Sequence, residues 1–143
     1  MSARARAMAA ARGAVGAKFR LHGRDPAFGL DCVGLAGLAM RAAGCEDEVP
    51  GGYALRGGVA ADFIALIDRD ALVRTDVPMP GDVLLFAVGP AQFHVAIKSV
   101  GGFVHADAML RRVVERPDPA PWPLVAAWAL VDPDAAEAMF DRG

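Results

Sequence analysis

Cysteine is scarce in this chain of 143 residues, which contains only Cys32 and Cys45. If Cys32 begins a helix and Cys45 lies just past its end, a rise of ~1.5 Å per residue separates the two by roughly 20 Å. A disulfide requires a Cα separation of only about 4.4–6.8 Å. The sequence therefore excludes a small scaffold held by disulfides and leaves two free thiols.

Long apolar runs are missing as well. The N-terminal segment is basic, and its short run at residues 8–11 is interrupted by Arg12. We expect neither a secretory signal nor a transmembrane span, and therefore synthesis in the cytoplasm with no membrane partner. The N-terminal arginines are better explained as the solvated face of a helix than as a nucleic-acid site.

What the chain does contain is typical of a folded globular protein. Hydrophobic residues make up 55% of it and charged residues 22%, with a net charge of −2. This composition excludes an intrinsically disordered chain. The length predicts a single domain over residues 1–143 that can bury a sizeable core.

Helical and strand-like patterns occupy different halves of the sequence. Helices are expected over residues 2–16 (with an apolar stripe of Met8, Ala11, Val15 and Phe19), from Cys32 to Gly44, and over residues 60–72. Turns or loops are expected at residues 23–26, 50–52, 78–81 and 101–102. Strands are expected over residues 83–88, 92–98, 103–107, 111–115 and 125–131, before a short helix at 134–140. Helices followed by an antiparallel sheet predict an α+β fold.

The second expected helix begins with the pair Asp31-Cys32. Asp31 is a good N-cap, because its carboxylate can accept a hydrogen bond from a free N–H of the first turn. Cys32 then occupies the first helical position, where the helix dipole favours the reactive thiolate. A buried structural cysteine is the alternative, because free cysteine is one of the most buried residue types.

Two histidines on strand-like segments, His94 and His105, favour the reactive interpretation of Cys32. A hairpin whose loop is Gly101-Gly102 would place them about 13 Å apart along the strands. A four-residue loop over residues 99–102 would make them diagonal neighbours about 7–8 Å apart at the backbone, and a bulge could do the same. The pattern leaves these registers open, and catalysis requires one of the closer ones.

Cysteine and histidine in this arrangement suit nucleophilic catalysis. Cys32 would be the nucleophile, His94 would deprotonate it or hold it as an ion pair, and His105 would orient His94. His22 would line the cleft or serve only as a turn residue. The alternative is a zinc site of Cys32, His94 and His105, but no paired metal-ligand spacing supports it, so we expect no metal and no cofactor.

Four motifs in this order resemble the NlpC/P60 family of papain-like cysteine peptidases. They are Gly29-Leu30-Asp31-Cys32-Val33-Gly34-Leu35, Pro80-Gly81-Asp82-Val83-Leu84-Leu85-Phe86, His94-Val95-Ala96-Ile97 and Phe103-Val104-His105-Ala106. The resemblance implies a Cys32–His94–His105 triad in an NlpC/P60 fold, with Asp31 as the acid that usually precedes the nucleophile. It also implies cleavage of peptidoglycan stem peptides, usually between D-glutamate and meso-diaminopimelate or lysine.

Residues 121–123, Pro-Trp-Pro, resemble the phage-tail and gene-transfer-agent branch of the family, which implies tail-like partner proteins and delivery to the wall in a tail-like particle. Val33 stands where the family usually has serine, and Phe19 stands where it has a tyrosine that lines the substrate site. The histidines are one residue closer than usual. A non-catalytic tail component, and an amidase or acyltransferase of the same fold, are the alternatives.

Overall fold

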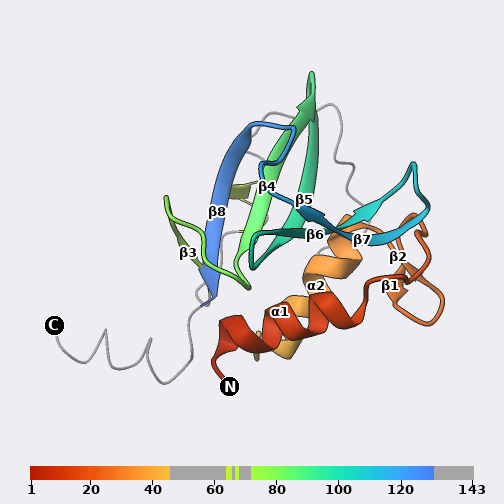
Figure 1. The fold of residues 1–143 in the computed structure, drawn as a ribbon, viewed down its shortest axis with the longest axis horizontal. Helices are drawn as coiled ribbons and strands as arrows, with labels where there is room; N and C mark the ends of the chain where they lie inside the picture. The colour runs from red at the N-terminus through yellow and green to blue at the C-terminus, as the bar shows by residue number, and fades with distance from the viewer. Residues whose placement is uncertain (46–63, 66, 68–71, 131–143) are drawn as a thin grey trace, which may run out of the picture.

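The computed structural model describes residues 1–45, 64–65, 67 and 72–130 (Figure 1). Its helices are α1 (Ala3–Gly13) and α2 (Cys32–Ala42). Its strands are β1 (Arg24–Asp25), β2 (Gly29–Leu30), β3 (Leu72–Arg74), β4 (Val83–Gly89), β5 (Gln92–Ser99), β6 (Gly102–Asp107), β7 (Arg112–Pro117) and β8 (Leu124–Leu130). The predicted loop at 50–52, most of the predicted helix at 60–72 and the predicted helix at 134–140 lie outside the described residues. Leu72, expected to end a helix, instead begins β3.

The strands β3 to β8 form one antiparallel sheet in the order β3-β8-β4-β5-β6-β7. Both helices pack against each other beside this sheet (Figure 1). In a large apolar cluster, the helices pack against alternate side chains of the central strands, which lie on one face of the sheet and include Leu85, Val95 and Val104. A smaller cluster lies on the opposite face and includes Phe86, Ala96 and Phe103. The predicted α+β fold, with N-terminal helices packed on an antiparallel sheet, is confirmed.

The buried face of α1 shares only Ala11 with the predicted stripe. It consists of Ala3, Ala7 and Ala11, and Ala14 just beyond the helix end is also buried. Val15 is 44% exposed. Small side chains at every fourth position let α1 approach α2 closely, which the larger residues of the predicted stripe would prevent.

Of the arginines of α1, Arg12 lies on the solvated face that the sequence predicts and pairs there with Glu115, whereas Arg4 and Arg6 make contacts within the fold. Arg4 pairs with the buried Asp82, with Nε 2.8 Å from Oδ1. Arg6 donates to the carbonyl oxygens of Ala42 and Ala43 at the end of α2. These contacts satisfy a buried carboxylate and free helix carbonyls, which a purely solvated face would leave without partners.

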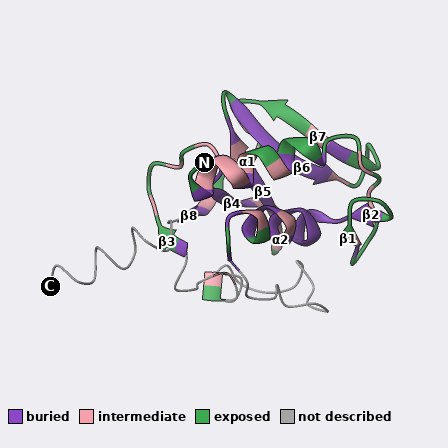
Figure 2. Ribbon diagram, turned by 90° about the horizontal axis from the view of Figure 1, so that it is seen from below, coloured by how far each residue is buried: buried purple, intermediate pink, exposed green. Residues whose placement is uncertain are grey.

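The helix α2 begins and ends where the sequence predicts. Asp31 caps it by accepting from the Gly34 N–H at 2.8 Å, and Gly44 ends it with a positive φ of 95°. Figure 2 shows α2 buried along most of its length. Gly34 is required for close packing, because a Cβ there would overlap the carbonyl oxygen of Gly23. The segment before α2 therefore packs directly on its first turn.

Candidate active site

Cys32 lies at the first position of α2, as predicted, and is only 6% exposed. The backbone N–H groups of Val95, Val33 and Cys32 itself interact with its thiol and lower its pKa. Val95 belongs to β5 and directly follows His94. The structure therefore brings the nucleophile expected from the sequence next to the strand that carries the expected base.

The two predicted histidines meet. His94 Nε2 and His105 Nδ1 are 2.9 Å apart, and the rings are nearly perpendicular at 86°. This contact follows from the hairpin register, in which Ile97 faces Val104 and Ser99 faces Gly102. This is the register that a four-residue loop over residues 99–102 would give. In the structure Ser99 and Gly102 also pair, so that only Val100 and Gly101 remain in the loop. Gly101 makes the turn with a φ of 74°.

The sheet opens at the site, because β5 and β6 stop pairing with each other beyond Ile97 and Val104. From there β5 continues along β4, with His94 facing Phe86, and β6 continues along β7, with His105 facing Val114. The histidine side chains thus extend between two diverging strands. The hydrogen bond between the two imidazole rings connects β5 and β6 where their backbones no longer pair.

The geometry decides which nitrogen of His94 can act as a base. Its Nε2 is engaged with His105, so Nδ1 is the atom left for a thiol. For Nδ1 to accept a proton, Nε2 must carry one and donate it to His105 Nδ1. His105 then carries its own proton on Nε2, which is buried without a hydrogen-bond partner among the described residues.

Burial sets the charge state of all three groups. It raises the pKa of Cys32 to about 11, helped by the nearby Asp31 carboxylate. Burial also lowers the pKa of His94 to about 4, helped by the charge of His105. The pKa of His105 is lowered by burial as well, against the influence of Asp107. The expected resting thiolate is therefore wrong, because desolvation outweighs the N–H groups at the start of α2.

Cys32 and His94 do not form a hydrogen bond in the described part of the chain, and no charged pair joins them. The neutral thiol, the neutral His94 and the neutral His105 form a site in which a proton moves only when the sulfur attacks. Of the two roles that the sequence leaves open for His94, deprotonation during the reaction fits this structure better than a standing ion pair.

Trp122 is the site residue that the sequence analysis did not identify as such. Its ring lies 5.6 Å from that of His94 and 5.7 Å from that of His105, edge-on to both. It also contacts Phe86 and Phe103, and the guanidinium of Arg116 lies 5.6 Å from its centre. Trp122 thus covers the histidine pair and contributes to its desolvation. In the sequence Trp122 stands out only by its position between two prolines, and that position does not indicate a contact with histidines that lie much earlier in the chain.

The three residues expected to contact substrate occupy different positions. The Asp31 carboxylate receives hydrogen bonds from the N–H groups of Gly34 and His22 and from Arg24. His22 has a φ of 62° and lines a pocket beside Asp31. Phe19 is half-buried, bridges to Leu30 and packs against the helix-side core. Asp31 and His22 are thus adjacent to the nucleophile, whereas Phe19 contacts the strand that leads into it.

The described residues offer no cluster of three or more histidine, cysteine, aspartate or glutamate side chains that could hold a metal ion. The zinc alternative therefore lacks a ligand set in this part of the structure. Within the same residues, no helix is both long enough and apolar enough to span a membrane.

No protein-family model matches the chain, and no curated protein matches its sequence. Solved structures do match its fold. NlpC1 from Trichomonas vaginalis aligns with a TM-score of 0.65 at 22% identity, over 90% of this chain and 45% of that one. The NlpC/p60 domain of the peptidoglycan hydrolase SagA aligns at 0.59 and 20% identity, over 89% and 98%.

A third match is the peptidoglycan hydrolase RipB from Mycobacterium tuberculosis, with a TM-score of 0.59 and 18% identity, over 91% of this chain and 65% of RipB. The chain thus spans less than half of the Trichomonas protein but nearly all of the isolated SagA domain. At these identities the likeness concerns the fold. The chain has the papain-like fold of NlpC/P60 domains, which it shares with peptidoglycan hydrolases.

Proposed function

We propose that this protein is a cysteine peptidase that hydrolyses stem peptides of peptidoglycan, at the bond between D-glutamate and diaminopimelate. One observation carries the proposal: the His94–His105 hydrogen bond leaves His94 Nδ1 as the free base, and the backbone N–H of the next residue, Val95, interacts with the Cys32 thiol. The shared fold with peptidoglycan hydrolases supports the substrate class.

The proposed reaction begins with proton transfer from the Cys32 thiol to His94 Nδ1 while the sulfur attacks the scissile carbonyl. The N–H groups at Cys32 and Val33, which already interact with the sulfur, offer stabilisation to the negative charge that develops. His94 then gives its proton to the leaving amine as the C–N bond breaks. Water, deprotonated by His94, hydrolyses the resulting thioester and restores the thiol.

The test is incubation with muropeptides of defined sequence and mass spectrometry of the products. The wild-type protein should release a peptide that begins with the diamino acid, and Cys32→Ala should release none. Thermal unfolding of both proteins shows whether the fold persists. Hydrolysis by Cys32→Ala at the wild-type rate would contradict the assignment of the nucleophile.

A second candidate is a non-catalytic component of a phage-tail-like particle. It is favoured by one observation, the burial that raises the pKa of Cys32 well above that of a free thiol. Absence of cleavage by a folded wild-type protein on every muropeptide would select this candidate.

We also propose that the protein reaches the cell wall as part of a tail-like particle after synthesis in the cytoplasm. Support comes from the sequence alone, in the Pro-Trp-Pro segment at residues 121–123. Sedimentation of particles from producing cells tests this proposal, since the protein should be found with the particles and not only in the soluble fraction.

A further inference from the structure

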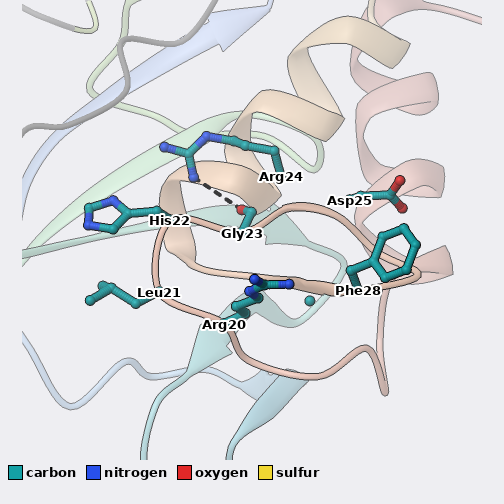
Figure 3. Close-up of a pocket in the computed structure, with 8 residues that line it drawn as sticks. Arg20, Leu21, His22, Gly23, Arg24, Asp25 and Phe28 are labelled. Carbon is teal, nitrogen blue, oxygen red and sulfur yellow. Dashed lines mark hydrogen bonds between the residues drawn. The ribbon is translucent and has the colours of Figure 1, made fainter.

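A pocket of about 360 Å³ opens in the segment that precedes the nucleophile and has no part in the chemistry described above. It lies in the segment between α1 and α2, and its walls include Arg20, Leu21, His22, Arg24 and Phe28. Figure 3 shows Arg20 lying between Phe28 on one side and Leu21 and His22 on the other. Two guanidinium groups, an imidazole and two largely exposed apolar side chains thus surround one opening.

The charges in this pocket are not equivalent. Arg24 is neutralised, because its Nη1 lies 2.9 Å from Asp31 Oδ1 and also donates to the Gly23 carbonyl, as drawn in Figure 3. Arg20 is exposed, and its guanidinium has no hydrogen-bond or ion-pair partner among the described residues. Arg20 is therefore the cation that remains available to a ligand.

Asp25 also lines the pocket and would oppose an anion. Its Oδ1 accepts a hydrogen bond from the Ala27 N–H at the turn between β1 and β2, away from Leu21 and His22 in Figure 3. An anion would therefore be bound at the end formed by Arg20 and His22, with Asp25 at the other end.

The pocket is rigidly tied to the nucleophile. The His22 N–H donates to Asp31 Oδ2 at 2.8 Å, and Asp31 directly precedes Cys32. His22 is held at a φ of 62°, a conformation that a non-glycine residue adopts at some cost in energy. This strained backbone keeps the His22 side chain among the residues that line the pocket. The pocket is thus linked by a hydrogen bond to the residue that precedes Cys32.

Asp31 is largely occupied within the chain, because its carboxylate accepts three hydrogen bonds, two on Oδ1 and one on Oδ2. Its charge is also paired with that of Arg24. Arg20, whose guanidinium has no partner among the described residues, is therefore the charged group more available to a ligand.

We propose that this pocket binds a carboxylate of the substrate peptide through Arg20, with Leu21 and Phe28 packing against the aliphatic carbons next to it. A guanidinium can bind a carboxylate with two parallel hydrogen bonds. This proposal rests on the proposed function for the kind of peptide. Besides its C-terminal carboxylate, such a peptide carries two candidate groups, the α-carboxylate of D-glutamate and the distal carboxylate of diaminopimelate.

The experiment measures binding by calorimetry in the Cys32→Ala protein, so that turnover does not interfere. Three peptides, each amidated at its C-terminal carboxylate, are compared: L-alanyl-γ-D-glutamyl-diaminopimelate, its form with an amidated D-glutamate α-carboxylate, and its form with lysine in place of diaminopimelate. Loss of affinity on amidation identifies the D-glutamate group, and loss on exchange to lysine identifies the distal group.

Arg20→Gln should weaken binding of the first peptide by about tenfold or more. It should also bind the first peptide no more tightly than the modified peptide that the Arg20-containing protein binds more weakly. Glutamine keeps the Cβ, which packs closely on Gly29. Lys18→Gln removes the same charge outside the pocket lining and should have little effect. Asp25→Asn removes the opposing charge and should leave binding unchanged or make it tighter.

Equal affinities in Arg20→Gln and Lys18→Gln would overturn the proposal, as would the absence of any difference among the three peptides.

Hydrolysis of the first peptide by the Cys32-containing protein is measured separately. If it is cleaved but Arg20→Gln binds it normally, only the pocket assignment fails. If Arg20-dependent binding persists without cleavage by the wild type, the peptidase proposal fails and the pocket assignment holds. Absence of binding by every peptide overturns the pocket assignment.

Discussion

The imidazole of His105 is held by one hydrogen bond and by aromatic contacts, and among the described residues no carboxylate is hydrogen-bonded to it, although the charge of Asp107 acts on its pKa. It can therefore orient His94 but contributes no fixed negative charge to stabilise a protonated His94. This separates its role from that of a buried carboxylate in a triad. A neutral group that accepts a hydrogen bond from His94 Nε2 should replace part of its function.

We predict a graded loss of hydrolysis for the two histidines. His94→Ala should reduce kcat by about 10²–10⁴-fold, the usual contribution of a general base. His105→Gln should keep more activity than His105→Ala, because the amide oxygen can accept the hydrogen bond from His94. Steady-state kinetics on a defined muropeptide measures this order, and equal rates for His105→Gln and His105→Ala would contradict the orienting role.

The thiol offers a second prediction. Because burial raises the pKa of Cys32 to about 11, its alkylation by iodoacetamide should accelerate about tenfold per pH unit from pH 6 to pH 9. A preformed thiolate–imidazolium pair would instead react at a rate that is almost constant over this range. Peptide mapping distinguishes Cys32 from Cys45, which is also buried, and a plateau for Cys32 below pH 7 would show that the ion pair exists.

Among the elements, α2 could be predicted in full, whereas the covering of the histidine pair could not. Asp31, Cys32 and Gly44 are local signals, because capping and termination depend on neighbouring residues. The sequence leaves several hairpin registers open, since a shift of two residues preserves the pattern of alternating faces. Trp122 reaches the histidines only because its loop folds over β4 and β5, and no pattern within that loop encodes the contact.

The loop that carries Trp122 should affect the pH dependence of catalysis. Trp122→Ala exposes the histidine pair to water, which weakens the desolvation that lowers the pKa of His94. We predict that the acidic limit of kcat/KM moves upward from near pH 4 towards pH 6. Trp122→Phe keeps much of the cover and should shift it less. A limit that stays in place in Trp122→Ala would show that the ring has no part in the desolvation of His94.

On the scale of the whole molecule, the sequence predicted the layers but not how α1 is attached to them. Asp82 has no exposed surface and receives hydrogen bonds from Arg4 and from the N–H groups of Met79 and Leu130. It thereby joins α1 to the start of β4 and to the end of β8. The alternation of apolar residues shows which face of a strand is buried, but it does not show which distant arginine will neutralise an acid in that face.

The half-buried His94 and the buried His105 make the stability of the whole fold depend on pH. The pKa of His94 is about 4 in the folded protein and close to 6.5 when the chain is unfolded, and that of His105 is also lowered. Between these values the unfolded chain binds more protons than the folded one, so the free energy of unfolding falls as the pH decreases through this range. The contribution is fully present above about pH 6.5 and is lost as the pH approaches 4.

We therefore predict that the free energy of unfolding decreases between pH 7 and pH 4, with His94 alone accounting for roughly 3 kcal/mol over a pKa difference of about 2.5. Urea denaturation at a series of pH values measures it. His94→Gln removes this titration and should flatten the curve. Parallel curves for the wild type and His94→Gln would mean that His94 is not buried in its neutral form, and the proton transfer proposed for Cys32 would then begin from a charged imidazole.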